Sequence, residues 1–265
     1  MSTLPTRTSW QVTRSVWYAM FMREAVSRTM ADRLGWFWMI FEPVAMIAIM
    51  VFIRSFISGS HRLITGADFI PWMIVGMMGF FLVREGMTRS MGAINANKAL
   101  FTYRQVHPVD TVLVRVFLDC MLRTFIFLLF IVGGLLLELD IFPDNAIYAL
   151  LGWLSLWGLG LGLGLVVSVT ATLIPETSKI ISMISLPLLI ISGVIFPLNV
   201  MPHYLLEYLM LNPIAHGLEL LRLGFFSSYK VVHGTSETYL WLFILALNAL
   251  GLLMHVRFKE RLKAQ

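Results

Sequence analysis

Residues 146–173 read AIYALLGWLSLWGLGLGLGLVVSVTATL, a long run in which no side chain is charged. A helix needs about 20 apolar residues to cross the roughly 30 Å hydrocarbon core of a bilayer. The run therefore predicts a membrane-spanning helix that is longer than the minimum. Four of its glycines, Gly158, Gly160, Gly162 and Gly164, place small residues at four-residue intervals on two faces of this helix. This pattern predicts close helix packing rather than a phosphate-binding loop.

Similar apolar runs occupy most of the remaining chain. Of its 265 residues, 58% are hydrophobic and 13% are charged, and the mean hydropathy is +0.80. This composition excludes a water-soluble domain. The runs predict six transmembrane helices over residues 36–57, 69–91, 112–137, 146–173, 180–197 and 239–256. The predicted fold class is therefore an all-α membrane protein with a single polytopic bundle.

Basic residues are distributed unevenly about these spans. Most of them lie in residues 1–35, 84–115 and 257–265, on one side of the predicted membrane. The positive-inside rule then places both termini in the cytoplasm. The chain divides into a cytoplasmic N-terminal segment 1–35, a transmembrane domain 36–256 and a basic cytoplasmic tail 257–265. Because the basic residues follow this membrane pattern, no nucleic-acid partner is expected.

Residues 10–34 have the periodicity of an amphipathic helix. Apolar residues fall on one side, and the opposite side carries Arg14, Glu24, Arg28 and Asp32. Arg23 interrupts the apolar side and would have to extend its charged end toward water. We expect a helix that lies in the cytoplasmic interface of the membrane. A simple topological anchor is the alternative interpretation.

The predicted loop 95–110 combines aromatic, basic and proline residues, namely Phe101, Tyr103, Arg104, Val106, His107 and Pro108. This composition predicts a compact cytoplasmic docking surface, although an ordinary loop has the same elements. On the other side, residues 198–238 are too long for a turn and too apolar for a free loop. They predict short helices that lie on or dip into the outer leaflet, interrupted at Asn212-Pro213.

Charged residues inside the spans are the most informative positions, because each costs about 3 kcal/mol at the bilayer centre unless it is paired or hydrated. Arg115, Asp119 and Arg123 share one face of the third span. Two interpretations stay open: a basic lining for an anionic substrate, or an ion-paired helix contact. Arg84, Glu85 and Arg89 at the end of the second span have the same two interpretations. Trp38 could stack on a sugar or belong to an interfacial aromatic belt.

Motifs for catalysis and nucleotide binding are absent from the sequence. No lysine follows a glycine, so the phosphate loop Gly-x-x-x-x-Gly-Lys-Ser/Thr does not occur. If ATP drives this protein, a separate subunit must bind it. The single cysteine, Cys120, excludes a multi-cysteine metal site, and no pair of histidines has metal-ligand spacing. No metal or catalytic residue is predicted, and an intramembrane glycolipid-processing enzyme that uses Glu42, Asp119 or His216 is the competing hypothesis.

Several short sequence strings, taken in their order along the chain, resemble those of a known family. They are Met22-Arg23-Glu24, Leu34-Gly35-Trp36-Phe37-Trp38 before Glu42-Pro43, Gly92-Ala93-Ile94 with Asn97, the run from Leu100 to Asp110, Phe196-Pro197-Leu198, and Asn212-Pro213 with His216, Glu219 and Arg222. From about residue 20 to residue 256 this set resembles the membrane permease of type-2 ABC exporters of capsular polysaccharide, the KpsM type. The resemblance implies a bacterial inner-membrane protein that exports an acidic, lipid-linked glycan. Related permeases for O-antigen or teichoic acid are the alternative within this class.

The resemblance also implies partners. Such permeases are homodimers with two copies of a separate ATPase that binds ATP and Mg²⁺, so no cofactor is expected in this chain. The glycan would pass through the dimer interface to a periplasmic co-polymerase and an outer-membrane export protein. The expected ATPase-coupling residues are Leu100, Phe101, Tyr103, Arg104, Val106 and Pro108, flanked by an interface helix with Arg23, Glu24 and Arg28.

Two further residue sets complete the expected sites. The re-entrant helices of the periplasmic segment 198–238 would place Asn212, Pro213, His216, Glu219 and Arg222 at the exit. A substrate pathway is expected at Arg84, Arg89, Arg115, Asp119, Arg123 and Trp38, where the basic side chains would suit an acidic polymer.

Overall fold

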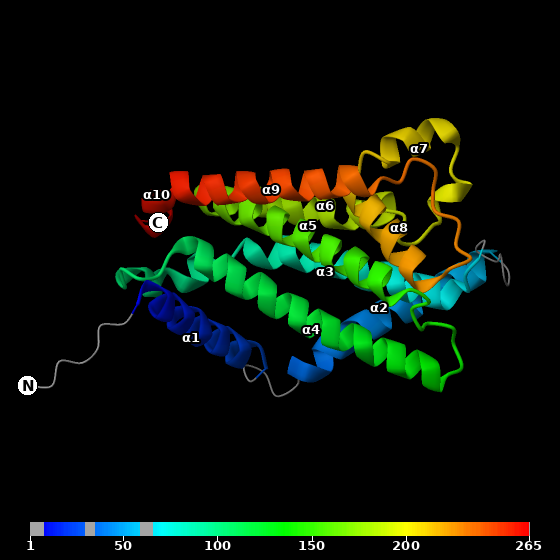
Figure 1. The fold of residues 1–265 in the computed structure, drawn as a ribbon, viewed down its shortest axis with the longest axis horizontal. Coiled ribbons are helices and arrows are strands. Elements are labelled where there is room, and N and C mark those ends of the chain that lie inside the picture. The colour runs from blue at the N-terminus through cyan, green and yellow to red at the C-terminus, as the bar shows by residue number, and fades with distance from the viewer. Residues whose placement is uncertain (1–7, 30–34, 59–65, 265) are drawn as a thin grey trace, which may run out of the picture.

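A computed structural model describes residues 8–29, 35–58 and 66–264, and within these ranges the chain is built from helices. The elements are α1 (Ser9–Thr29), α2 (Gly35–Ser58), α3 (Phe69–Ser90), η1 (Asn95–Thr102), α4 (Pro108–Leu136), α5 (Ala146–Leu173), α6 (Glu176–Ile191), η2 (Leu198–Val200), α7 (His203–Leu209), α8 (Pro213–Phe225), α9 (Glu237–Arg257) and α10 (Lys259–Ala264). The long helices run side by side, with α10 at one end of the bundle and α7 at the other (Figure 1).

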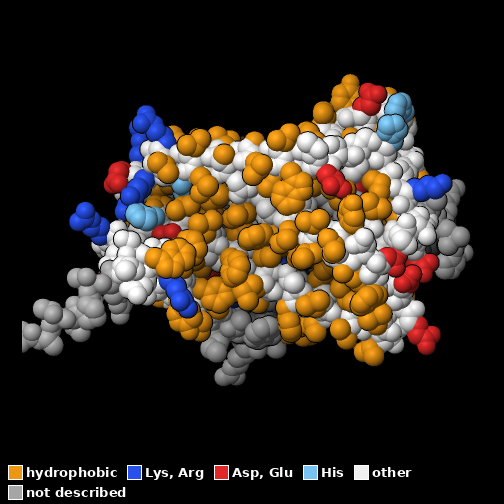
Figure 2. All heavy atoms as spheres, in the orientation of Figure 1, with side chains coloured by type: hydrophobic (Ala, Val, Ile, Leu, Met, Phe, Trp, Pro, Cys, Tyr) orange, Lys and Arg blue, Asp and Glu red, His pale blue; other side chains and the backbone are white. Residues whose placement is uncertain are grey.

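Four helices in the described ranges are long and apolar enough to cross a membrane: α3, α4, α5 and α9. Their bounds agree with the predicted spans within a few residues. Apolar side chains cover the middle of the molecule, and most of the charged ones visible in this view lie toward its ends (Figure 2). An all-helical protein with apolar spans is therefore confirmed.

The remaining two predicted spans are less regular. The helix α6 has 16 residues, which is about 24 Å at 1.5 Å per residue and shorter than the hydrocarbon core. The expected span 180–197 was wrong in its last part, because the backbone leaves the helix after Ile191 and turns at Gly193, whose φ is +71°. In α2, the strongly apolar portion is Ile40–Ile53. A count of six spans therefore stays a prediction.

Glycines set how closely α5 approaches its neighbours. A Cβ atom added to Gly86 of α3 would lie 2.8 Å from the backbone of Gly160, and one added to Gly162 would lie 2.9 Å from Leu247 of α9. The two glycine faces of α5 therefore meet two different helices. This confirms the close packing predicted from the glycine spacing.

The segment between α6 and α9 folds into short helices, as predicted, and the chain breaks between α7 and α8 at Asn212-Pro213. The side chain of Asn212 caps α8 by accepting a 3.0 Å hydrogen bond from the backbone of Ile214, and Pro213 occupies the first turn. Most of α8 is buried, and a Cβ on Gly152 of α5 would lie 2.7 Å from Leu221 of α8. The short helix α7 has no buried residue.

Besides the main apolar core, to which Trp72 of α3 and Leu156 of α5 belong, a second apolar cluster lies at the end of the bundle that carries α10. Its members include Met20 of α1, Phe101 of η1, Leu262 of α10, and Val106 in the loop before α4. Leu262 is fully buried. The residues 257–265, expected as a basic tail, are therefore not a free extension as far as they are described. Arg257 ends α9, and α10 is fastened by its one buried leucine.

The contact between α3 and α5 can be tested with one methyl group. Gly86→Ala should lower the unfolding free energy by about 1–3 kcal/mol, because the backbone of Gly160 blocks the new Cβ. Gly133→Ala in α4 is the matched control, since a Cβ there meets nothing within 4 Å. It should leave stability unchanged or raise it by up to about 1 kcal/mol. Thermal unfolding in detergent measures both variants, and equal effects would contradict the packing argument.

Candidate functional site

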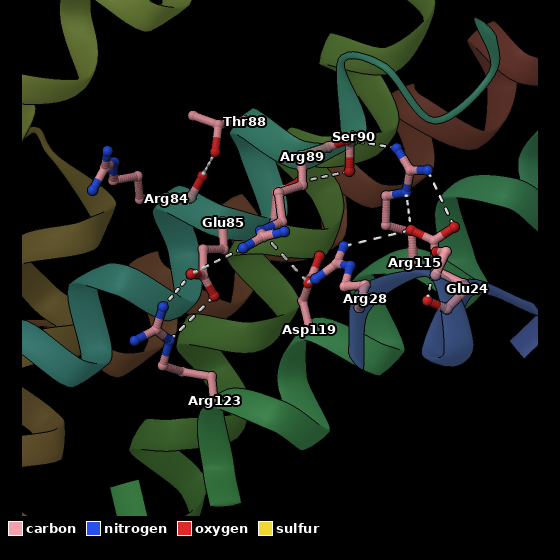
Figure 3. A network of polar contacts seen from close by, with 12 residues as sticks. Glu24, Arg28, Arg84, Glu85, Thr88, Arg89, Ser90, Arg115, Asp119 and Arg123 are labelled. Carbon is pink, nitrogen blue, oxygen red and sulfur yellow. Dashed lines mark hydrogen bonds and ion pairs between the residues drawn. The ribbon is translucent and has the colours of Figure 1, made fainter. Parts of the chain in front are cut away.

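The N-terminal helix α1 lies alongside α4 and is joined to it by polar contacts. The indole of Trp17 donates a 2.9 Å hydrogen bond to Asp110. Farther along, Glu24 accepts a 3.2 Å hydrogen bond from Arg115, whose Nε atom lies 2.8 Å from its other carboxylate oxygen, and Arg28 forms an ion pair with Asp119. These three pairs follow the same order in both helices, so α1 and the first part of α4 run parallel. Figure 3 shows the second and third pairs.

The same face of α4 is paired with α3. Arg123 contacts Glu85 with two nitrogen atoms, one of them at 3.1 Å. Its guanidinium carbon also lies 5.1 Å from the centre of the Phe81 ring. Arg89 lies between Asp119, at 3.8 Å, and Glu85, at 4.0 Å. We call the seven residues Glu24, Arg28, Glu85, Arg89, Arg115, Asp119 and Arg123 the ionic network.

Burial decides between the two interpretations of these charges. The side chains of Asp119 and Arg123 are 3% and 6% exposed, whereas that of Arg89 is 42% exposed. Arg115, Asp119 and Arg123 thus face other protein groups, as an ion-paired helix contact requires. The geometry favours that interpretation over a basic lining for these three residues.

The polar side of the N-terminal helix faces protein as well as water. Glu24 and Arg28 turn toward α4 instead of water, because oppositely charged partners stand there. Arg23 is exposed, and Asp32 lies outside the described residues. The sequence held a signal for this contact in the charges of Arg115 and Asp119 in the third span, but their partners on α1 lie 91 residues away in the chain.

The expected coupling residues separate into two groups. Phe101, Val106 and Pro108 are buried, and the first two belong to the second apolar cluster. Leu100 is partly buried against it, whereas Tyr103 is 65% exposed and Arg104 is also exposed. Only the exposed pair can present side chains to a partner in this structure. The buried residues instead hold the loop against α1, α4 and α10.

At the opposite end, the expected exit residues form a buried polar cluster. Glu219 and Arg222 are fully buried and pair at 3.1 Å. Arg222 also donates to the carbonyl of Gly193 at 2.9 Å and lies over the Trp72 ring, 3.5 Å from its centre. Both residues are enclosed by protein, and their place beside an exit stays a prediction.

Further bonds complete this cluster. The hydroxyl of Tyr229 donates to both oxygens of Glu219, and burial raises the pKa of that phenol, which keeps its proton in place. His216 bonds the carbonyl of Met210 at 2.7 Å and the backbone nitrogen of Ser236 at 3.0 Å. The amide of Asn212 donates to Ser192 at 2.9 Å. These bonds fix α8 to the turn after α6 and to the segment before α9.

Two expected pathway residues are separate from both clusters. Trp38 of α2 is 56% exposed and packs edge-on against Phe37 and Phe41. Arg84 is partly buried, and its guanidinium points away from the ionic network (Figure 3). Within the described ranges, no three His, Cys, Asp or Glu side chains gather as metal ligands.

The buried pair predicts a large response to a small change. Glu219→Gln should destabilise the protein by roughly 3 kcal/mol, because it leaves the fully buried Arg222 without its counter-charge. Glu207→Gln removes the carboxylate of the exposed pair His203–Glu207, whose side chains are 83% and 72% exposed, and should change stability by less than about 0.5 kcal/mol. Unfolding in detergent distinguishes the two. A similar small effect for both variants would contradict the assignment of Glu219 as the counter-ion.

Comparison with known proteins identifies the family of this chain. The profile of the family described as ABC-2 type transporter matches residues 15–226. The chain is 32% identical to the polysialic acid transport protein KpsM of Escherichia coli, over 94% of this chain and 95% of that protein. It is 29% identical to the capsule polysaccharide export inner-membrane protein CtrC of Neisseria meningitidis, over 93% of this chain and 92% of that protein. It is 28% identical to the corresponding protein BexB of Haemophilus influenzae, again over 93% and 92%. The chain belongs to the ABC-2 type transporter family.

Proposed function

We propose that this chain is the membrane permease subunit of an ATP-driven exporter that moves capsular polysaccharide across a bacterial inner membrane. The supporting observation is the similarity to KpsM, CtrC and BexB, which extends over more than 90% of this chain and of each relative. Their names assign those proteins to polysaccharide transport or capsule export. The expected acidic, lipid-linked glycan is part of this proposal.

ATP would be bound, with Mg²⁺, by two copies of a separate ATPase subunit. This part rests on the family and on the lack of a phosphate loop in the sequence. The docking surface would centre on Tyr103 and Arg104, the exposed members of the expected coupling segment. The second apolar cluster beneath them connects this surface to α1 and α10, which supports a role in transmitting movement.

The end that carries α10 would face the cytoplasm, so that both termini lie there. The concentration of arginine and lysine in residues 84–115 and 257–265 supports this orientation. We further propose six spans with α2 and α6 completing the set, and re-entry of α7 and α8 from the periplasmic side. A homodimer would enclose the pathway and pass the glycan to periplasmic and outer-membrane partners.

The pathway proposal keeps Arg84 and Trp38. Both are at least partly accessible and neither belongs to the ionic network or to the buried exit cluster. Arg89 is not retained, because it belongs to the ionic network, where its guanidinium lies between the carboxylates of Glu85 and Asp119. His216 and Asp119 are engaged in structural bonds, so the competing hypothesis of an intramembrane enzyme gains no support from their geometry.

The transport function is tested by removing the protein from its native cell. Deletion should leave complete glycan inside the cytoplasm and none on the surface, because synthesis precedes export. Subcellular fractionation followed by glycan staining measures both pools, and reintroduction of the intact chain is the control. Loss of the glycan itself would favour an enzyme and overturn the exporter assignment.

The docking surface is tested by one tyrosine. The Tyr103 side chain is 65% exposed. Tyr103→Ala should weaken ATPase binding about tenfold, since an interface tyrosine that is a hot spot contributes more than 1 kcal/mol. Tyr208→Ala is the matched control, because that side chain is 73% exposed in α7, at the other end of the bundle (Figure 1). Affinity purification with quantification of the co-purified ATPase gives the ratio. Equal retention by both variants would refute the surface.

A further inference from the structure

One carboxylate oxygen connects three helices. Asp119 lies on α4, and its Oδ1 atom is contacted by Arg28 of α1 and, at 3.8 Å, by Arg89 of α3 (Figure 3). The Asp119 side chain is 3% exposed. Because little water reaches it, its attraction to both arginines is screened less than that of a surface pair. Any displacement of α1 relative to α3 therefore acts on this oxygen.

The contacts on the α1 side are tight. Arg28 is in close contact with Asp119. One turn earlier on α4, Arg115 contacts both oxygens of Glu24, at 2.8 and 3.2 Å, so α1 is joined to two successive turns of α4. The exposed fractions of the Glu24, Arg28 and Arg115 side chains are 12%, 11% and 13%. We infer from these pairs that α1 and the first part of α4 move as one unit.

The contacts on the α3 side are of two kinds. Arg123 is held to Glu85 through two nitrogen atoms. One turn away, Arg89 lies at 3.8 Å from Asp119 and 4.0 Å from Glu85, and it makes no side-chain hydrogen bond to either. Its side chain, 42% exposed, is the most accessible of the network. The pair Glu85–Arg123 can thus act as a pivot, about which the distance from Arg89 to Asp119 changes.

We propose that Asp119 and Arg89 are positioning residues that transmit movement of α1 to α3. When the ATPase displaces the α1–α4 unit, Arg89 exchanges between Asp119 on α4 and Glu85 on its own helix. Arg89 pairs with both carboxylates in this structure, so movement toward one strengthens that pair as it weakens the other, and the two arrangements differ little in energy, which a switching element requires. This inference rests on the proposed function, since it assigns a role to the network in coupling ATP hydrolysis to export.

The test uses the full complex of permease and ATPase in lipid nanodiscs or vesicles, with Asp119→Asn, Arg89→Gln and the double variant. Each single variant should still bind the ATPase in equal amount and hydrolyse ATP, while glycan exported per ATP falls on the order of fivefold to tenfold. The double variant should lose no more than one single variant, because both changes remove the same link. Arg14→Gln is the control, since Arg14 is an exposed arginine of α1 outside the network.

The possible outcomes distinguish failure of the Asp119–Arg89 link from failure of the proposed exporter function. Wild-type export per ATP in both single variants, or losses that multiply in the double variant, would overturn the link while leaving the exporter intact. If Asp119→Asn fails to assemble, Arg89→Gln decides alone, because the Arg89 side chain is 42% exposed and its removal leaves the pairs Arg28–Asp119 and Arg123–Glu85 in place. A wild-type complex that exports nothing would overturn the proposed function and the inference together.

Discussion

A charged side chain that is removed from water must meet an opposite charge, and much of this arrangement follows from that requirement. Asp119 and Arg123 on α4 are nearly fully buried, so α1 and α3 must supply Arg28 and Glu85. At the other end, Arg222 is enclosed beside Glu219 and fixes α8 to the turn after α6. Such pairs add little net stability compared with apolar packing, but removing one partner is expensive. They therefore specify which helices are neighbours.

Between these charged ends, glycines, which have no side chain, determine how closely the helices pack. The glycines of α5 let α3 approach on one side and α9 on the other, to distances that a methyl group would prevent. In a bilayer, lipid competes equally well for apolar side chains, so close contact over a smooth surface is an effective way to join helices. This explains why α5, with no charged residue, lies at the centre of the bundle.

The two ends of the molecule differ in how their polar groups are held. At the α7 end, His216, Glu219 and Arg222 each bond to backbone groups, and Glu219 and Arg222 also pair with each other, which fixes α8 and the loops around it together. In the ionic network, the bonds run mostly between side chains of different helices, and Arg89 is only loosely held. Movement is easier to accommodate in the second arrangement. That end also carries the exposed Tyr103 and Arg104.

By itself, the sequence determined the helical class, the bounds of four spans, the break at Asn212-Pro213 and the close packing around α5. These features depend on local hydrophobicity, on proline and on glycine spacing, which are visible in any one segment. Only the tertiary structure decided that Arg28 meets Asp119, that Phe101 and Val106 face the core, and that Glu219 and Arg222 are enclosed. The periodicity of a helix shows which residues share a face. What stands opposite that face depends on how helices far apart in the chain are packed, and no local pattern records it.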